Sequence, residues 1–174
     1  MRWLRSFSLV TAAGLYLILI MGALVTKTGS EDGCGNTWPF CNGEILPTYA
    51  TVETVIEYSH RIVSALVGLM VVILAVWAWR GFRGDRIVRF LAFNGVFFVV
   101  FQGLLGAAAV VWDQSDAVLA LHFGFSLLSF ASVALLAVYV TQAERVEGRR
   151  LQRIAVSQRL RYAVWGLAAY TYLV

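Results

Sequence analysis

The stretch "VIEYSHRIVSALVGLMVVILAVWAW", residues 55–79, decides the fold. It is mostly apolar and exceeds the about 20 residues that a helix needs to cross the hydrocarbon core of a bilayer. Its first turns nevertheless contain an acid, an imidazole and a guanidinium, in Glu57, His60 and Arg61. Ionisable side chains are costly inside a membrane and usually mark functional positions. The stretch therefore predicts a transmembrane helix with a chemical site near one end.

The composition of the whole chain is typical of a membrane protein. Of its 174 residues, 60% are hydrophobic and only 14% are charged, which indicates long apolar segments rather than a larger soluble core. Four segments are predicted to cross the membrane as helices, at 6–25, 58–79, 90–112 and 117–140. A fifth, 162–174, stops after about 20 Å of helix. We expect an all-α integral membrane protein, with a four-helix transmembrane bundle and the start of a fifth helix, as part of a longer protein or as a natural half of one.

The basic residues predict the orientation. Twelve of the 14 lysines and arginines precede the first predicted helix, separate the second from the third, or follow the fourth. These regions should be cytoplasmic by the positive-inside rule, which makes 26–56 an extracellular loop and 141–161 a cytoplasmic basic linker in a multi-pass protein of the cell membrane. Anionic lipid is a fitting partner for that linker. Nucleic-acid binding is disfavoured because the arginines are divided among short juxtamembrane loops.

Both cysteines lie in the long outer loop, in "GCGNTWPFCNG", as Cys34 and Cys41. A close pair outside the cytoplasm predicts a disulfide. We favour a structural staple over a redox-active pair, because the C-x-x-C spacing of redox motifs is absent. A loop of this length, punctuated by Trp38 and two prolines, is more typical of a functional lid than of a slack linker.

The only two histidines, His60 and His122, are each predicted to lie about one turn into a helix that begins at the outer surface. Their equal depth favours one shared ligand, and imidazole is a good ligand for iron. Small residues four to eight positions further on would leave a flat slot on the same face of each helix. The alternative is that each histidine bonds a neighbouring carbonyl or hydroxyl and only specifies helix packing. The small residues are Ser64 and Gly68 after His60, and Ser126 and Ser129 after His122.

Three further polar positions have two interpretations each. Glu57 shares a helix face with His60, and is either a proton-transfer group or an acid favoured by the helix N-terminus. Arg61 points about 100° away from His60 and is a candidate to reach the interface or to pair with a carboxylate, including a haem propionate. In "FQGLLGAAAV", Gly103 and Gly106 predict a close helix contact, across which Gln102 hydrogen-bonds rather than touching substrate.

Five motifs together resemble the N-terminal half of the bacterial haem A synthase family, of the Bacillus-like type with paired loop cysteines. They are "GALVTKTGS", "GCGNTWPFCNG", "IEYSHR", "FQGLLGAAAVV" and "ALHFG", and the resemblance covers essentially all of 1–174. It implies half of an eight-helix protein with a pseudo-two-fold repeat. It also implies an oxidoreductase that converts haem O to haem A for cytochrome oxidase assembly, oxidising a ring methyl group to a formyl group in successive steps.

By position, the resemblance assigns His60 and His122 as the iron ligands of the substrate haem, Glu57 as the catalytic acid, and Cys34–Cys41 as the outer-loop disulfide. A haem b cofactor is expected in the C-terminal half. Expected partners are haem O, membrane lipid, the C-terminal half or a second copy, haem O synthase and an electron donor. Two other functions stay open: a bis-histidine haem b electron-transfer module without porphyrin chemistry, and a haem-free assembly subunit that relays thiols.

Overall fold

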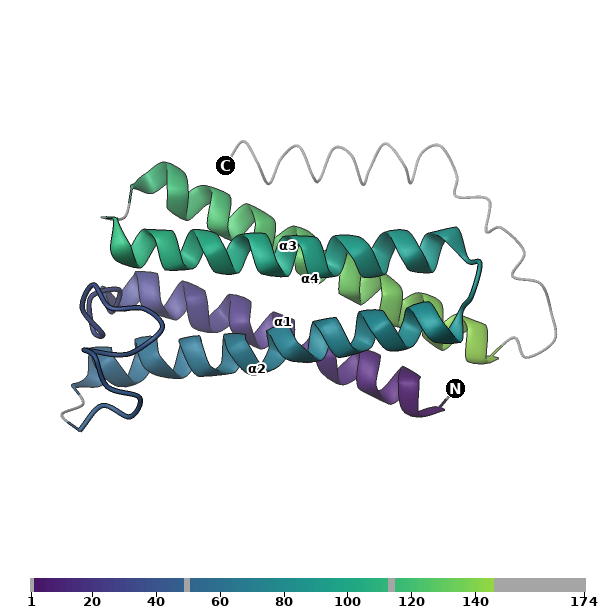
Figure 1. The fold of residues 1–174 in the computed structure, drawn as a ribbon, viewed down its shortest axis with the longest axis horizontal. Coiled ribbons are helices and arrows are strands. Elements are labelled where there is room, and N and C mark those ends of the chain that lie inside the picture. Colours follow the sequence, from purple (N-terminus) through teal and green to yellow (C-terminus); the bar gives the residue numbers. More distant parts are fainter. Residues whose placement is uncertain (1, 49–50, 113–114, 146–174) are drawn as a thin grey trace. The chain divides into compact units, whose positions relative to one another are not determined.

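The computed structural model describes residues 2–48, 51–112 and 115–145, and these form four long helices (Figure 1). All four are long and apolar enough to cross a membrane. The prediction of an all-α membrane bundle is thus confirmed. The predicted cytoplasmic linker and the start of a fifth helix fall almost entirely outside the described residues. The helices are α1 (Arg2–Thr28), α2 (Val52–Gly81), α3 (Arg86–Val111) and α4 (Asp116–Arg145).

The helices extend beyond the apolar segments that predict them. α2 begins at Val52 rather than at 58, because the side chain of Thr51 caps it by accepting a 3.2 Å hydrogen bond from the backbone N–H of Thr54. His60 therefore lies more than two turns into α2, and His122 nearly two turns into α4, deeper than the single turn predicted. At 1.5 Å per residue these depths are about 12 Å and about 9 Å. The two histidines therefore lie at similar distances from the starts of their helices.

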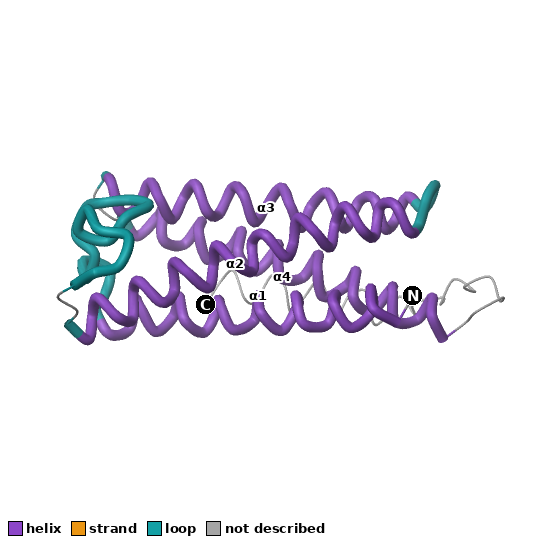
Figure 2. The backbone as a smooth tube through the Cα atoms, turned by 60° about the horizontal axis from the view of Figure 1, so that its bottom comes forward, coloured by secondary structure: helices purple, strands orange, loops and turns teal. Residues whose placement is uncertain are grey.

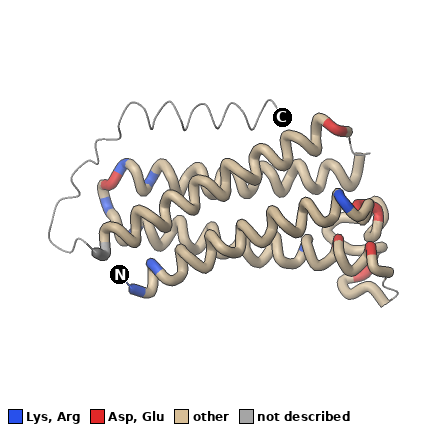
Figure 3. Tube along the Cα trace, turned by 180° about the vertical axis from the view of Figure 1, so that it is seen from behind, with Lys and Arg blue, Asp and Glu red and all other residues tan. Residues whose placement is uncertain are grey.

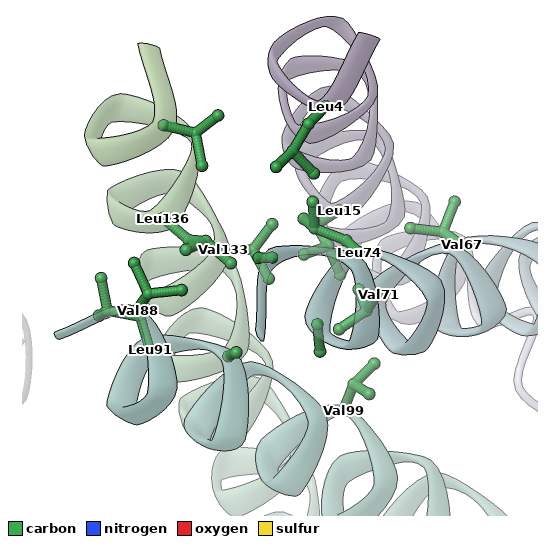
Figure 4. Close-up of a cluster of buried hydrophobic side chains, with 14 of the residues drawn as sticks. Leu4, Leu15, Val67, Val71, Leu74, Val88, Leu91, Val99, Val133 and Leu136 are labelled. Carbon is green, nitrogen blue, oxygen red and sulfur yellow. The ribbon is translucent and has the colours of Figure 1, made fainter. Parts of the chain in front are cut away.

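The packed core lies toward the end of the bundle that holds the N-terminus, and we call this region the packed half. All four helices contribute buried side chains to it (Figure 4). Leu74 of α2 and Leu136 of α4 are almost completely buried. Close approach of α3 and α4 depends on Gly95, since a Cβ there would lie 3.1 Å from Cγ2 of Val133. The hydroxyl of Ser129 donates a 3.1 Å hydrogen bond to the Gly95 carbonyl and joins the same two helices.

A tight turn at Asp85 ties three helices together at this end. Its carboxylate caps α3 by accepting hydrogen bonds from the backbone N–H groups of Ile87 and Val88, at 2.9 and 3.3 Å. The other carboxylate oxygen accepts a hydrogen bond from the hydroxyl of Tyr139 on α4. Figure 2 shows α2 and α3 meeting at this turn and diverging toward the opposite end of the bundle.

The surface of the bundle matches a membrane environment. Large apolar side chains such as Leu66, Phe90 and Leu104 are mostly exposed along the helices, as lipid contact requires. Among the described residues, lysines and arginines gather mainly at the end that holds the N-terminus, and acids gather at the loop end (Figure 3). The charge separation predicted from the sequence is therefore carried by the folded bundle.

Candidate functional site

The loop between α1 and α2 is folded around a disulfide. Cys34 and Cys41 are bonded, with an S–S distance of 2.07 Å, and both are fully buried. The backbone N–H of Asn42 donates a 3.1 Å hydrogen bond to the carbonyl of Cys34, which closes the ring. The predicted disulfide is present.

Two charged side chains of α2 hold this loop. The carboxylate of Glu57, only 4% exposed, accepts a 2.7 Å hydrogen bond from the backbone N–H of Cys34. It also forms an ion pair with Arg61, one turn along α2. The Arg61 guanidinium in turn donates to the carbonyls of Thr37 and Phe40, at 2.7 and 3.1 Å. Of the two roles predicted for Arg61, pairing with a carboxylate is observed, and the carboxylate is Glu57.

The loop also touches the first turns of α2 through its backbone. The hydroxyl of Thr54 donates a 2.8 Å hydrogen bond to the carbonyl of Gly33, and the hydroxyl of Tyr58 donates to that of Ile45. Gly33 lies so close that a Cβ there would be 2.5 Å from the backbone of Glu53. No other residue type fits this contact without displacing the loop.

A cavity of about 500 Å³ lies beneath the loop, and we call this part of the bundle the hollow half. Its volume is within the range typical of small-molecule and cofactor sites. All four helices and the loop contribute to its wall, and the two predicted histidines lie on it together. The polar residues of the lining are Thr26, Glu31, Asp32, Asn36, Glu57, His60, Arg61, Ser64, Gln102 and His122, with the indole of Trp38 beside them.

His60 has an unsatisfied, buried ring nitrogen. Its Nδ1 has no hydrogen-bond partner, and neither has the hydroxyl of Ser64 one turn below. Gly22 of α1 stands against the ring, because a Cβ there would lie 3.4 Å from Cε1 of His60. Buried polar groups normally have partners, so two such atoms on one cavity wall indicate a place for a ligand.

His122 is held by its neighbours on α3. Its Nδ1 lies 2.8 Å from the backbone carbonyl of Gln102, so this nitrogen carries the proton and Nε2 is left with a lone pair for a ligand. The hydroxyl of Ser126 donates a 2.5 Å hydrogen bond to Oε1 of Gln102. Gly106 stands against this ring, since a Cβ there would lie 3.1 Å from Cε1.

The structure corrects the predicted slot below His122. Ser64 and Gly68 line the cavity below His60 as predicted, but Ser126 and Ser129 do not line it. Their hydroxyls are buried against α3, where they bond Gln102 and Gly95, because small polar residues also serve as contacts between membrane helices. The α2 wall of the cavity therefore has small residues below its histidine, and the α4 wall does not.

The predicted contact at Gly103 and Gly106 is also only half right. Gly106 packs against His122, but nothing lies within 4 Å of a Cβ placed on Gly103. Gln102 makes the predicted bond across the helices and also lines the cavity. The sequence gives no signal for the role of Gly22, because its partner His60 is distant in the chain.

The arrangement suits a flat, iron-containing ligand. Two imidazoles from different helices line one cavity, and a glycine beside each ring removes side-chain bulk there. A carboxylate and a guanidinium lie at the loop end of the same cavity. Imidazole nitrogens of this kind are the usual axial ligands of haem iron.

Comparisons with known proteins agree with this chemistry. The family model described as COX15-CtaA, cytochrome oxidase assembly protein, matches residues 5–174. The chain is 48% identical to the heme A synthase of Alkalihalophilus pseudofirmus, over 98% of this chain and 57% of that protein. It is 47% identical to that of Geobacillus kaustophilus, over 99% and 54%. It is 56% identical to that of Halalkalibacterium halodurans, over 78% and 45%. The chain thus spans about half the length of the curated relatives it matches.

Proposed function

The chain belongs to the COX15-CtaA family of cytochrome oxidase assembly proteins, and from that premise we propose that it is the substrate-binding half of a haem A synthase. The activity would be oxidation of a ring methyl group of haem O to the formyl group of haem A, in successive steps. One observation carries the proposal. His60 and His122 line a single cavity that also contains the carboxylate of Glu57.

The two histidines would hold the iron of haem O. The fixed Nδ1 of His122 leaves Nε2 for coordination, and the unpartnered polar atoms around His60 leave its ring free to orient toward a ligand. When bound, the haem would supply the redox-active iron. The protein's part is to hold the macrocycle between two helices and to keep bulk solvent away with the loop.

Glu57 would act on protons or developing charge at the reacting carbon. Its carboxylate is held by the loop and by Arg61, so its position is fixed before substrate binds, which is the condition for efficient general acid–base catalysis. Arg61 keeps further N–H donors beyond those used on Glu57 and the loop carbonyls. We assign these donors to a haem propionate.

The remaining parts of the proposal concern the whole protein. A haem b cofactor would reside in a C-terminal half, which corresponds to the part of the longer relatives that this chain does not match. The end of the bundle that holds the N-terminus, rich in arginine, would face the cytoplasm, and the disulfide loop would lie outside the cell membrane. Haem O synthase would deliver the substrate, and a separate donor would supply electrons.

The test is to extract haems from membranes that carry the full-length gene product, in a host that makes haem O but has no haem A synthase of its own. The wild type should yield haem A. Glu57→Gln should lower haem A at least about 100-fold, the scale of a lost acid–base group, while haem O accumulates. Glu53→Gln, one turn earlier and exposed, is the matched control and should leave haem A unchanged.

Two results would contradict parts of this proposal. Undiminished haem A in Glu57→Gln would remove this residue from the reaction. Haem b as the sole haem in wild-type membranes, without haem A or a hydroxylated intermediate, would instead favour the electron-transfer module. His60→Ala and His122→Ala should each abolish the haem absorbance that belongs to this half.

A further inference from the structure

The wall of the cavity is incomplete between α2 and α3. Three apolar side chains both line the cavity and are 52–62% exposed on the outer surface. They are Leu69 of α2 and Val100 and Leu104 of α3. A residue that meets both the cavity and the surroundings lies at an opening. The lining residues of α1 and α4 that lie away from the loop, such as Gly22 and Phe123, are not exposed to this degree.

Glycines widen this opening on both sides. A Cβ placed on Gly68 of α2 or on Gly103 of α3 would meet nothing within 4 Å. Gly95, two turns earlier on α3, lies instead against Val133 in the packed half. The change from contact to open space follows the divergence of α2 and α3 away from their shared turn (Figure 2).

The opening faces lipid rather than water. Leu69 lies near the middle of the 30-residue α2, about 25 Å along the helix from Val52. The side chains around the opening are apolar, whereas the polar lining groups cluster below the loop. A ligand that uses this opening would therefore come from the membrane.

We propose that the gap between α2 and α3 is a lateral portal through which a lipid-soluble tetrapyrrole enters, and that its hydrocarbon chain lies across Gly68 and Gly103. Under the proposed function, on which this inference rests, the chain is the isoprenoid chain of haem O. Gly68 and Gly103 line the same cavity as both histidines, so a macrocycle held between the histidines can extend its isoprenoid chain into the opening. The isoprenoid chain exchanges contacts with lipid for contacts with protein, so selectivity arises from shape and not from release of water.

The test compares two haems in the purified full-length protein. Haem O carries the isoprenoid chain and protohaem lacks it, and binding to this half is measured by absorbance titration against His60→Ala as the blank. Gly68→Leu and Gly103→Leu should each weaken haem O binding about tenfold, the typical effect of overfilling a fitted space. Protohaem binding should change less than about twofold. Leucine also favours helix more than glycine does, so both variants should fold.

Gly81→Leu is the matched control, because Gly81 lies at the far end of α2, away from the cavity. This variant should bind both haems as the wild type does.

Equal weakening of the binding of both haems, or no weakening of either, in Gly68→Leu and Gly103→Leu would overturn the portal. If these variants lose thermal stability or fail to assemble, the face is an interface with another part of the protein, and the portal is likewise overturned. If the wild type makes haem A and the leucine variants bind haem O as tightly as the wild type does, the portal alone is refuted. A wild type that binds neither haem refutes the proposed function as well.

Discussion

The packed half and the hollow half are built from the same four helices, yet they are held together differently. In the packed half, side chains such as Leu74 and Leu136 fill the space between the helices and are almost fully buried. In the hollow half, the helices surround a cavity, and the disulfide loop joins the outer ends of α1 and α2. There, Glu57 and Arg61 form an ion pair with each other, and each hydrogen-bonds to the backbone of the disulfide loop.

This difference separates stability from binding along one bundle. The packed half can fix the arrangement of the helices without touching a ligand. The hollow half leaves room for a ligand, and hydrogen bonds and an ion pair stabilise it where packing is missing. Substitutions of the same kind should therefore have different consequences in the two halves.

The largest effect should come from Arg61→Ala. This change leaves the buried carboxylate of Glu57 without its counter-ion and frees two loop carbonyls. Breaking a buried ion pair on one side costs about 3 kcal/mol or more, which an unfolding titration in mixed micelles can measure. Arg80→Ala, at the exposed end of α2, should cost almost nothing. A loss from Arg61→Ala as small as that of Arg80→Ala would mean that packing, not the loop, holds the hollow half.

A pair of leucines on α2 comes next. Leu74→Ala removes a fully buried side chain and should cost about 2–3 kcal/mol of unfolding free energy through the cavity it leaves. Leu69→Ala, five residues earlier and 59% exposed, should cost less than about 0.5 kcal/mol. Haem affinity should show the opposite pattern: it should change in Leu69→Ala and stay the same in Leu74→Ala. Equal stability losses would show that the two halves are packed alike.

Two glycines of α3 sharpen the comparison further. A Cβ at either Gly95 or Gly106 would meet a neighbour at 3.1 Å, but the neighbour is Val133 in the packed half and the His122 ring in the hollow half. Gly95→Ala should destabilise the protein by about 1–2 kcal/mol because the valine has no free space. Gly106→Ala should cost less stability, since a small shift moves the ring toward the cavity rather than against a packed side chain, and should shift the haem absorbance instead. An unshifted spectrum would contradict the role of Gly106 beside the ring.

The smallest effect concerns two serines of α4. Ser126→Ala leaves the buried Oε1 of Gln102 without its donor and should cost about 1 kcal/mol. Ser132→Ala loses only a bond to its own helix, at the carbonyl of Leu128, and should be nearly neutral. Haem affinity should fall a few-fold in Ser126→Ala alone, measured by the same titration. A neutral Ser126→Ala would mean that water replaces the missing donor.

The sequence is sufficient to predict the four helices of the described residues, the loop disulfide and the two histidines that share a cavity. These features depend on hydropathy, on cysteine spacing and on distance from a helix end, and all three can be read along the chain. Hydropathy places the start of α2 too late, because it does not recognise the polar first turn that Thr51 caps. As a result, His60 and His122 are deeper than predicted.

Contacts between distant residues could not be predicted in the same way. The pairing of Gly22 with His60 and of Glu57 with the N–H of Cys34 depends on how the loop and the helices meet. The same limit explains Gly103 and Gly106. Spacing alone treats them alike, whereas in the fold Gly106 packs against His122 of α4 and Gly103 meets only open space.

The turn at Asp85 has a mechanical consequence. Because α2 and α3 meet there and diverge, the turn is the pivot of two long arms, and α3 alone is about 39 Å long. A rotation of about 3° at the pivot would move the far end of α3 by roughly 2 Å, by the same helix length. The carboxylate of Asp85, which holds the first turn of α3 and the hydroxyl of Tyr139, thus lies at the pivot of the opening that we propose, about 25 Å along α3 from Gly103.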